Sequence, residues 1–117
     1  MIMVRNILIA AAAFALLAGG ASAQNEPKGD AKAGATHFQK LGCYSCHGIW
    51  GQGTLRDGPR LNPPMPYPAL LAQVRTPRYE MPPYTESQIS DQAVADIYAY
   101  LASIPKAPDP KSIKLLQ

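Results

Sequence analysis

Residues 42–48 of this chain read Gly-Cys-Tyr-Ser-Cys-His-Gly and contain its only two cysteines, Cys43 and Cys46, followed directly by His47. Cys-x-x-Cys-His is the attachment signature of c-type haem, in which two thiols bond to the porphyrin vinyl groups and the imidazole binds the iron. Two intervening residues allow one turn of chain to present both sulfurs to one edge of the macrocycle. The motif therefore predicts that the rest of the chain folds as an envelope for a haem.

Other chemistries of a cysteine pair fit this sequence less well. A Cys43–Cys46 disulfide would close a loop too short to constrain the unfolded chain much. A redox-active dithiol of the thioredoxin type usually lies at the start of a helix that follows a strand, and no convincing run of strands surrounds the motif. A zinc site would need two further ligands, and His37 and His47 have no recognisable finger spacing. The dithiol remains the main alternative to haem.

The first 23 residues have the pattern of a secretory signal peptide. Arg5 forms a short positive region, residues 7–18 are apolar, and residues 21–23 read Ala-Ser-Ala, a small-x-small cleavage site. The apolar run is shorter than the roughly 20 residues that a membrane-spanning helix needs. We therefore expect an exported, periplasmic chain that starts at Gln24 and keeps no membrane span.

Composition limits both the protein interior and the class of partner. The chain has 117 residues and 12 prolines, so the part after the leader can form one small core with limited regular structure. Without Arg5, 10 of the 11 basic residues remain against 8 acidic ones, and a net charge of +2 is too small to indicate a nucleic-acid partner. A large apolar cofactor would supply the missing interior.

Three segments predict helices. Residues 31–41 follow Asp30, a suitable N-cap, and have apolar or small residues at spacings of three and four. A short helix is expected to enter at Tyr67-Pro68, with the proline in the first helical position, and to stop at Pro77. In the last and clearest helix Ser90 is the N-cap, a hydrophobic staple joins positions 89 and 94, and Pro105 ends the apolar stripe.

The remaining segments are expected to be irregular. Residues 24–29 are polar and predict a flexible N-terminus, and residues 106–117 predict an extended tail. Glycines and prolines punctuate residues 48–66 so heavily that we expect a long loop. Loops of this length are uncommon in a compact domain unless they wrap something or carry function. One domain, residues 30–105, should therefore enclose the cofactor.

A haem that only carries electrons needs a second axial ligand opposite His47. After the leader, the candidates are Met65, Met81 and His37. Met81 is preferred because the two prolines behind it stiffen the backbone, so the thioether can be held against iron with little loss of entropy. We expect a packing role for Met65 and a solvated or capping role for His37.

With these residues in place, the sequence resembles the class I c-type cytochromes, small soluble monohaem proteins, from residue 29 to residue 105. Besides the cysteine motif and Met81-Pro82, the resemblance rests on Gly34, Phe38, Gly58-Pro59-x-Leu61, Val74-Arg75 and Asp96-Ile97-Tyr98-x-Tyr100-Leu101. It implies an all-α small cytochrome c fold in which the N- and C-terminal helices cross closely around one covalently attached haem c. Gly34, Phe38, Tyr98 and Leu101 would share that crossing.

The resemblance also implies roles for residues around the haem. In relatives, the proline at the position of Pro59 offers its carbonyl to the second nitrogen of the ligand imidazole, which fixes the tautomer and orientation. A turn proline is the alternative for this position. Candidates for haem contact or for hydrogen bonds to the propionates are Trp50, Tyr67 and Tyr79, with core packing as the alternative for each. Arg75 could pair with a propionate or solvate a helix end.

The function expected is that of a periplasmic electron carrier and not an enzyme, with His47 and Met81 retained on the iron in both oxidation states. Its partners would be a redox donor and acceptor, such as an exported dehydrogenase or a terminal oxidase. Basic residues within 40–80 and an acidic face on the last helix could steer an acidic partner. The alternatives are a subunit bound permanently to an exported dehydrogenase, or a haem enzyme with a labile sixth ligand.

Overall fold

The computed structural model describes residues 27–116, so the predicted signal peptide and its cleavage site lie outside the described part. The described residues form four α-helices, two 3-10 turns and no strand, and this confirms the predicted all-α fold. The elements are α2 (Ala31–Lys40), α3 (Cys43–His47), α4 (Tyr67–Arg75), α5 (Asp91–Ser103), η1 (Pro110–Ser112) and η2 (Lys114–Leu116). None of these helices is both long enough and apolar enough to cross a bilayer.

Helix α2 begins where its capping residue predicted. The Asp30 carboxylate accepts the backbone N–H groups of Lys32 and Ala33 at 2.8 and 2.9 Å. These bonds favour the charged form and hold the pKa of Asp30 below its usual range. The helix ends at Lys40, one residue earlier than expected, and Leu41 caps it.

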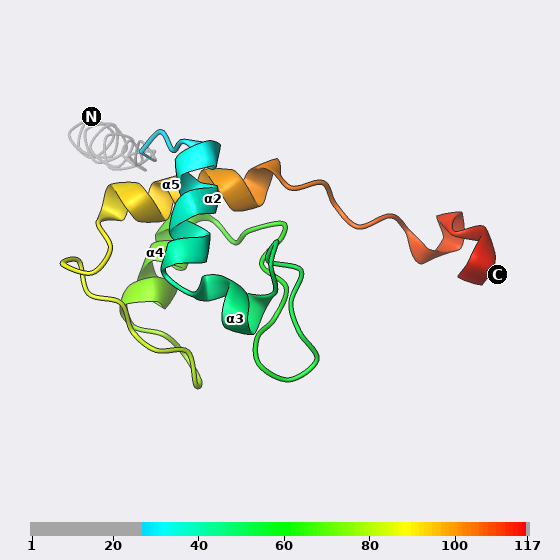
Figure 1. The fold of residues 1–117 in the computed structure, drawn as a ribbon, viewed down its shortest axis with the longest axis horizontal. Helices are drawn as coiled ribbons and strands as arrows, with labels where there is room; N and C mark the ends of the chain where they lie inside the picture. The colour runs from blue at the N-terminus through cyan, green and yellow to red at the C-terminus, as the bar shows by residue number, and fades with distance from the viewer. Residues whose placement is uncertain (1–26, 117) are drawn as a thin grey trace, which may run out of the picture.

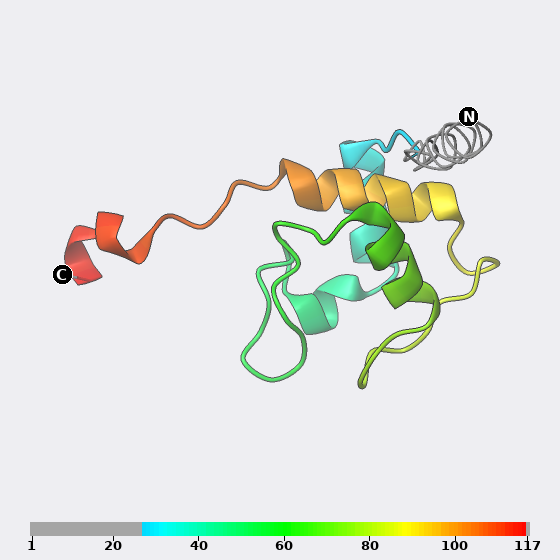
Figure 2. The same cartoon turned by 180° about the vertical axis from the view of Figure 1, so that it is seen from behind.

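Helices α2 and α5 cross at close range, as Figures 1 and 2 show from opposite sides. A Cβ atom on Gly34 would lie 1.9 Å from the carbonyl oxygen of Asp96, so only glycine fits between the two backbones. One turn further along α2, the fully buried Phe38 packs its ring at 5.6 Å, centroid to centroid, from Tyr100. Leu101 is also fully buried. The crossing that the family resemblance implied is therefore present.

Tyr98 differs from the expectation for this crossing. Its ring and the ring of Tyr67 on α4 pack edge to face, with their centroids 6.0 Å apart, whereas Tyr100 packs beside Phe38. Residues two positions apart in a helix point about 200° apart, so Tyr98 and Tyr100 lie on nearly opposite faces and α5 uses one tyrosine for α4 and the other for α2. Helix α5 thus packs against both other long helices.

Asp96 binds the start of α2 to the middle of α5. This buried carboxylate accepts the backbone N–H of Asp30 at 2.8 Å and the Gln92 amide at 3.0 Å. The Nε2 atom of His37 lies 3.7 Å from the other carboxylate oxygen of Asp96. His37 is half-buried at the helix crossing, whereas the sequence predicted a solvated or capping role.

The other two helix entries depend on local sequence. Ser90 accepts the N–H of Ala93 at 3.2 Å, as predicted for the N-cap of α5, and Ile89 is buried beside the start of the helix. In α4, Pro66 takes the cap position and Pro68 is the second helical residue, one position later than the sequence predicted. The N–H groups in the first turn of a helix have no partner within the helix, so both positions tolerate a proline, which has no N–H.

The long loop of residues 48–66 has no helix, as predicted, but it is tied down at several points. The Thr54 hydroxyl donates to the carbonyl of Cys46 at 3.1 Å and accepts the N–H groups of Asp57 and Gly58. Further along, the buried Asn62 amide donates to the carbonyls of Leu101 and Ile104 at the end of α5. The loop is thereby anchored to the helices on both sides.

The tail is less extended than we expected. Residues 105–109 run away from the helices in Figure 1, and η1 and η2 come after them. The Asp109 side chain accepts the N–H of Lys111 at 2.9 Å and so caps η1. A short capping residue before a proline is enough to start such a turn.

Gly34→Val should destabilise the protein by about 1–3 kcal/mol or more, because the added side chain must push α5 away from α2. The measurement is urea unfolding followed by helical circular dichroism. Thr36→Ala on the exposed face of α2 is the control and should stay within about 0.5 kcal/mol of the parent protein. Equal stability of the two variants would contradict the close crossing.

Candidate functional site

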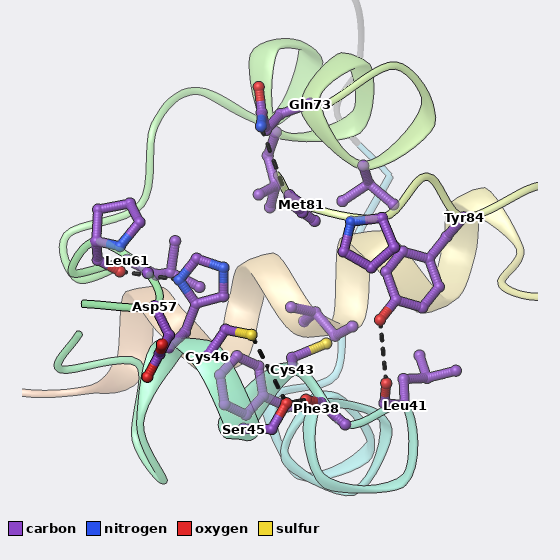
Figure 3. A pocket seen from close by; sticks show the side chains of 18 of the residues that line it. Phe38, Leu41, Cys43, Ser45, Cys46, Asp57, Leu61, Gln73, Met81 and Tyr84 are labelled. Atoms are coloured by element: carbon purple, nitrogen blue, oxygen red, sulfur yellow. Dashed lines mark hydrogen bonds between the residues drawn. The ribbon is translucent and has the colours of Figure 1, made fainter. Parts of the chain in front are cut away.

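A cavity of about 860 Å³ lies between the helices and the loops. Its volume falls within the roughly 300–1,000 Å³ typical of small-molecule and cofactor sites. Residues of α2, α3, α4 and α5 line it together with most of residues 54–61 and 78–84, and its inner wall is apolar. Figure 3 shows side chains from these elements pointing into one space.

Helix α3 carries both cysteines to the cavity wall. Gly42 and Gly48 bracket the single turn at φ values of 74° and 78°, a left-handed range that favours glycine. Cys43 and Cys46 are three residues apart and therefore share one helical face. Both are free thiols and line the cavity, where Figure 3 shows their sulfurs side by side with Ser45 below.

The surroundings of the two thiols separate the alternatives raised by the sequence. No strand precedes the motif within residues 27–116, so the β/α setting of a redox dithiol is lacking there. Nor do three or more His, Cys, Asp or Glu side chains gather in this part of the chain, as a zinc site would require. Burial raises the pKa of the Cys43 thiol, and the nearby Cys46 adds to the shift, so Cys43 is a protonated thiol at neutral pH.

His47 is buried at the end of α3 with its ring held by the loop. Its Nδ1 atom lies 2.9 Å from the carbonyl oxygen of Pro59. Because a carbonyl can only accept, Nδ1 carries the proton and Nε2 keeps its lone pair for a metal. This is the placement of Pro59 that the family resemblance implied.

Gly58 allows this contact, a role that was not recognised from the sequence. A Cβ atom there would lie 2.8 Å from the carbonyl oxygen of Cys46 and 2.9 Å from Nδ1 of His47. The loop backbone can approach the ring only because position 58 has no side chain. The sequence signal that could have indicated this role is the position of Gly58 directly before Pro59.

Met81 lies across the cavity from the cysteines in Figure 3, on the segment between α4 and α5. Its sulfur is 3.8 Å from Nε2 of Gln73, which extends from α4. The segment is anchored by Tyr84, whose N–H donates to the Val74 carbonyl at 3.0 Å and whose hydroxyl donates to the Leu41 carbonyl at 3.2 Å. Half-buried Met81 is thus held from two helices.

Burial beside the thiols also affects Tyr84. It raises the pKa of the hydroxyl, and the neighbouring Cys43 and Cys46 add to the shift. The hydroxyl therefore remains a donor to Leu41 throughout the neutral range. Neither Gln73 nor Tyr84 was expected from the sequence to belong to the site, because their partners lie on other segments.

The donor set fits a c-type haem. Two thiols share one wall, an imidazole with a free Nε2 lone pair comes directly after them, and a thioether faces them from another segment. These are the groups that such a haem uses for covalent attachment and axial ligation. Met65 also lines the cavity, with 43% of its surface exposed, so the geometry alone keeps it as a second thioether candidate.

Three predicted cofactor-binding residues do not reach the cavity wall. Trp50 is 64% exposed, and the Tyr67 hydroxyl donates to the Asp91 carbonyl at 3.1 Å. The Arg75 guanidinium forms an ion pair with the Asp91 carboxylate and donates to the Tyr84 carbonyl at 3.1 Å. The packing alternative therefore suits Tyr67, and Arg75 ties α4 to the start of α5. Tyr79 lies at the rim of the cavity, where 98% of its surface is exposed.

A comparison with protein families matches residues 29–101 to the family described as "Cytochrome C oxidase, cbb3-type, subunit III". The match spans α2 to α5 and includes both cysteines, His47 and Met81. A search of curated proteins found no match, and a search of solved structures found none.

Gly58→Ala should displace the His47 ring from Pro59, because the new methyl group would overlap both the ring and the Cys46 carbonyl. We expect a stability loss of about 1–3 kcal/mol and faster solvent exchange of the Nδ1 proton, measured by NMR. Arg60→Ala, an exposed change in the same loop, should alter neither. A slowly exchanging Nδ1 proton in Gly58→Ala would contradict the contact.

Proposed function

Because the chain belongs to the family described as cytochrome C oxidase, cbb3-type, subunit III, and so carries a c-type cytochrome domain, we propose that it is an exported monohaem cytochrome c that passes single electrons between redox proteins. The observation that carries the proposal is the meeting of two thiols, an imidazole and a thioether around one cavity. A cytochrome c domain indicates an electron-transfer haem protein. One covalently bound haem, its ligands and its compartment are parts of the proposal.

In this proposal each side chain has one task. Cys43 and Cys46 would form the thioether bonds to a haem c, and His47 and Met81 would be the ligands of its iron. The bound haem c would supply an iron that takes one electron from a reduced donor protein and gives it to an oxidised acceptor. Pro59 holds the imidazole, and the anchored Met81 segment holds the thioether, so neither ligand needs to move.

The surroundings of the cavity favour a carrier over a haem enzyme. Methionine ligation and apolar walls both disfavour the additional charge of ferric iron, so a relatively high reduction potential is expected. An enzyme would want an acid or base close to the reacting centre. The carboxylates among the lining residues, Asp57 and Glu80, are both exposed.

Exposed charges of both signs line the mouth of the cavity. Arg56 and Arg78 are exposed there, and so are Asp57 and Glu80. The acidic face that we expected on α5 is weaker than predicted, since Asp96 is buried and Asp91 pairs with Arg75. A partner protein would meet both signs of charge at the mouth, so the charges there do not favour an acidic partner, and electron-transfer interfaces of this kind are small and transient.

A second candidate is a subunit held permanently on a larger complex. The description of the matched family, a subunit of a cytochrome c oxidase, favours this candidate, with a terminal oxidase as the partner. An exported dehydrogenase remains a proposal from the sequence alone. Co-purification of a stoichiometric complex from the native host would favour the subunit, and recovery of the single chain would favour the free carrier.

The ligand proposal is tested by removing each thioether from protein made in a host that attaches c-type haem. The parent protein should show the methionine-to-iron charge-transfer band in its ferric spectrum. Met81→Ala should lose the band, and Met65→Ala, the matched control on the same cavity, should keep it. A reversed pattern would assign the ligand to Met65, and a five-coordinate high-spin parent protein at neutral pH would support the enzyme alternative.

Export and covalent attachment are tested by a single mass measurement on the periplasmic fraction. The expected species begins at Gln24 and carries the mass of one haem that acidified acetone does not extract. Cys43→Ala should retain only one thioether bond and give a shifted ferrous spectrum. A chain that keeps residues 1–23 and requires detergent would overturn the proposed localisation.

A further inference from the structure

Both the oxygen and the nitrogen of the Gln73 side-chain amide form hydrogen bonds next to Met81. Its Oε1 atom accepts the backbone N–H of Arg78 at 3.4 Å, and its Nε2 atom lies 3.8 Å from the Met81 sulfur. A backbone N–H can only donate, so it directs the amide oxygen toward Arg78 and the NH₂ group toward Met81. Figure 3 shows this amide above the thioether.

We propose that Gln73 is a positioning residue for the Met81 thioether, an inference that rests on the proposed role of Met81 as axial ligand. A thioether sulfur is a weak hydrogen-bond acceptor. The N–H of Gln73 occupies one side of the sulfur, and both residues line the cavity. Gln73 therefore selects which side of the sulfur is offered to a metal.

The backbone of the Met81 segment does not provide this selection by itself. Hydrogen bonds from Arg78 to Gln73 and from Tyr84 to Val74 attach both ends of the segment to α4. The two prolines after Met81 stiffen the chain between these ends. The methionine side chain still has three rotatable bonds, and its sulfur can turn either way. A donor on the rigid helix α4 removes that freedom.

The same hydrogen bond affects the strength of the ligand. An N–H that points at the sulfur withdraws electron density, so the thioether donates less to a metal on its other side. Weaker donation disfavours the ferric state relative to the ferrous state. Hydrogen bonding to a ligand is one of the means by which proteins tune haem potentials. Removing the Gln73 donor should therefore lower the reduction potential.

The test replaces Gln73 with residues of similar size whose side chains carry no N–H group. Gln73→Met and Gln73→Leu should both keep the methionine-to-iron band and both lower the potential, by at least about twofold in the equilibrium constant for reduction, the low end for a weak hydrogen bond. Gln39→Met is the matched control, because that glutamine on α2 donates to the Ile49 carbonyl and does not line the cavity. Gln73 variants with the potential of this control would overturn the inference.

A measurement on the parent protein does not depend on how the variants fold. In the diamagnetic ferrous form, the Nε2 protons of Gln73 should show an NMR cross-peak to the Met81 methyl group, and the absence of that cross-peak would overturn the proposal. The Met81→Ala spectrum separates the two levels of failure. If Met81→Ala keeps the ligand band, the proposed site is wrong. If Met81→Ala loses the band and the Gln73 variants match the control, only this inference fails.

Discussion

The contact between Gly34 and the Asp96 carbonyl sets the distance between α2 and α5, and the rest of the site is built on that distance. Phe38 and Leu101 can be fully buried only because the two helix backbones touch. Both side chains also line the inner wall of the cavity. The helix crossing is therefore at once the main core of this small domain and the back of its candidate cofactor site.

The two sides of the site are fixed by different physical means. On one side, local sequence suffices, since two glycines with positive φ start and end α3, and the cysteines are separated by one helical turn. On the other side, the Met81 segment is placed by hydrogen bonds to other parts of the chain, from Gln73 to Met81 and from Tyr84 to Val74 and Leu41, and these bonds close only in the folded chain. A site of this kind would hold both candidate ligands still, as the proposed electron carrier requires.

The same division separates the features that could be predicted from the sequence from those that could not. The caps Asp30 and Ser90, the all-α fold and the role of Gly34 depend on local patterns or on the family resemblance, and the structure confirms them. The partners of Arg75 and Tyr67 could not be predicted, because Asp91 lies 16 residues from one and 24 from the other. No local rule indicates which of several polar groups a side chain will meet after the chain turns back.

A count of charged residues in the sequence does not give the charge that a partner protein would meet on the folded surface. The sequence has acidic residues along α5, yet folding places Asp96 against the start of α2 and pairs Asp91 with Arg75. These pairings remove both carboxylates, and one arginine, from the charge that a partner protein would meet. Arg56 and Arg78 have no such carboxylate partner in the described ion pairs, but they line the cavity together with the exposed Asp57 and Glu80. The small excess of positive charge in the sequence is therefore not concentrated where the cofactor would be approached, because charges of both signs meet there in equal number.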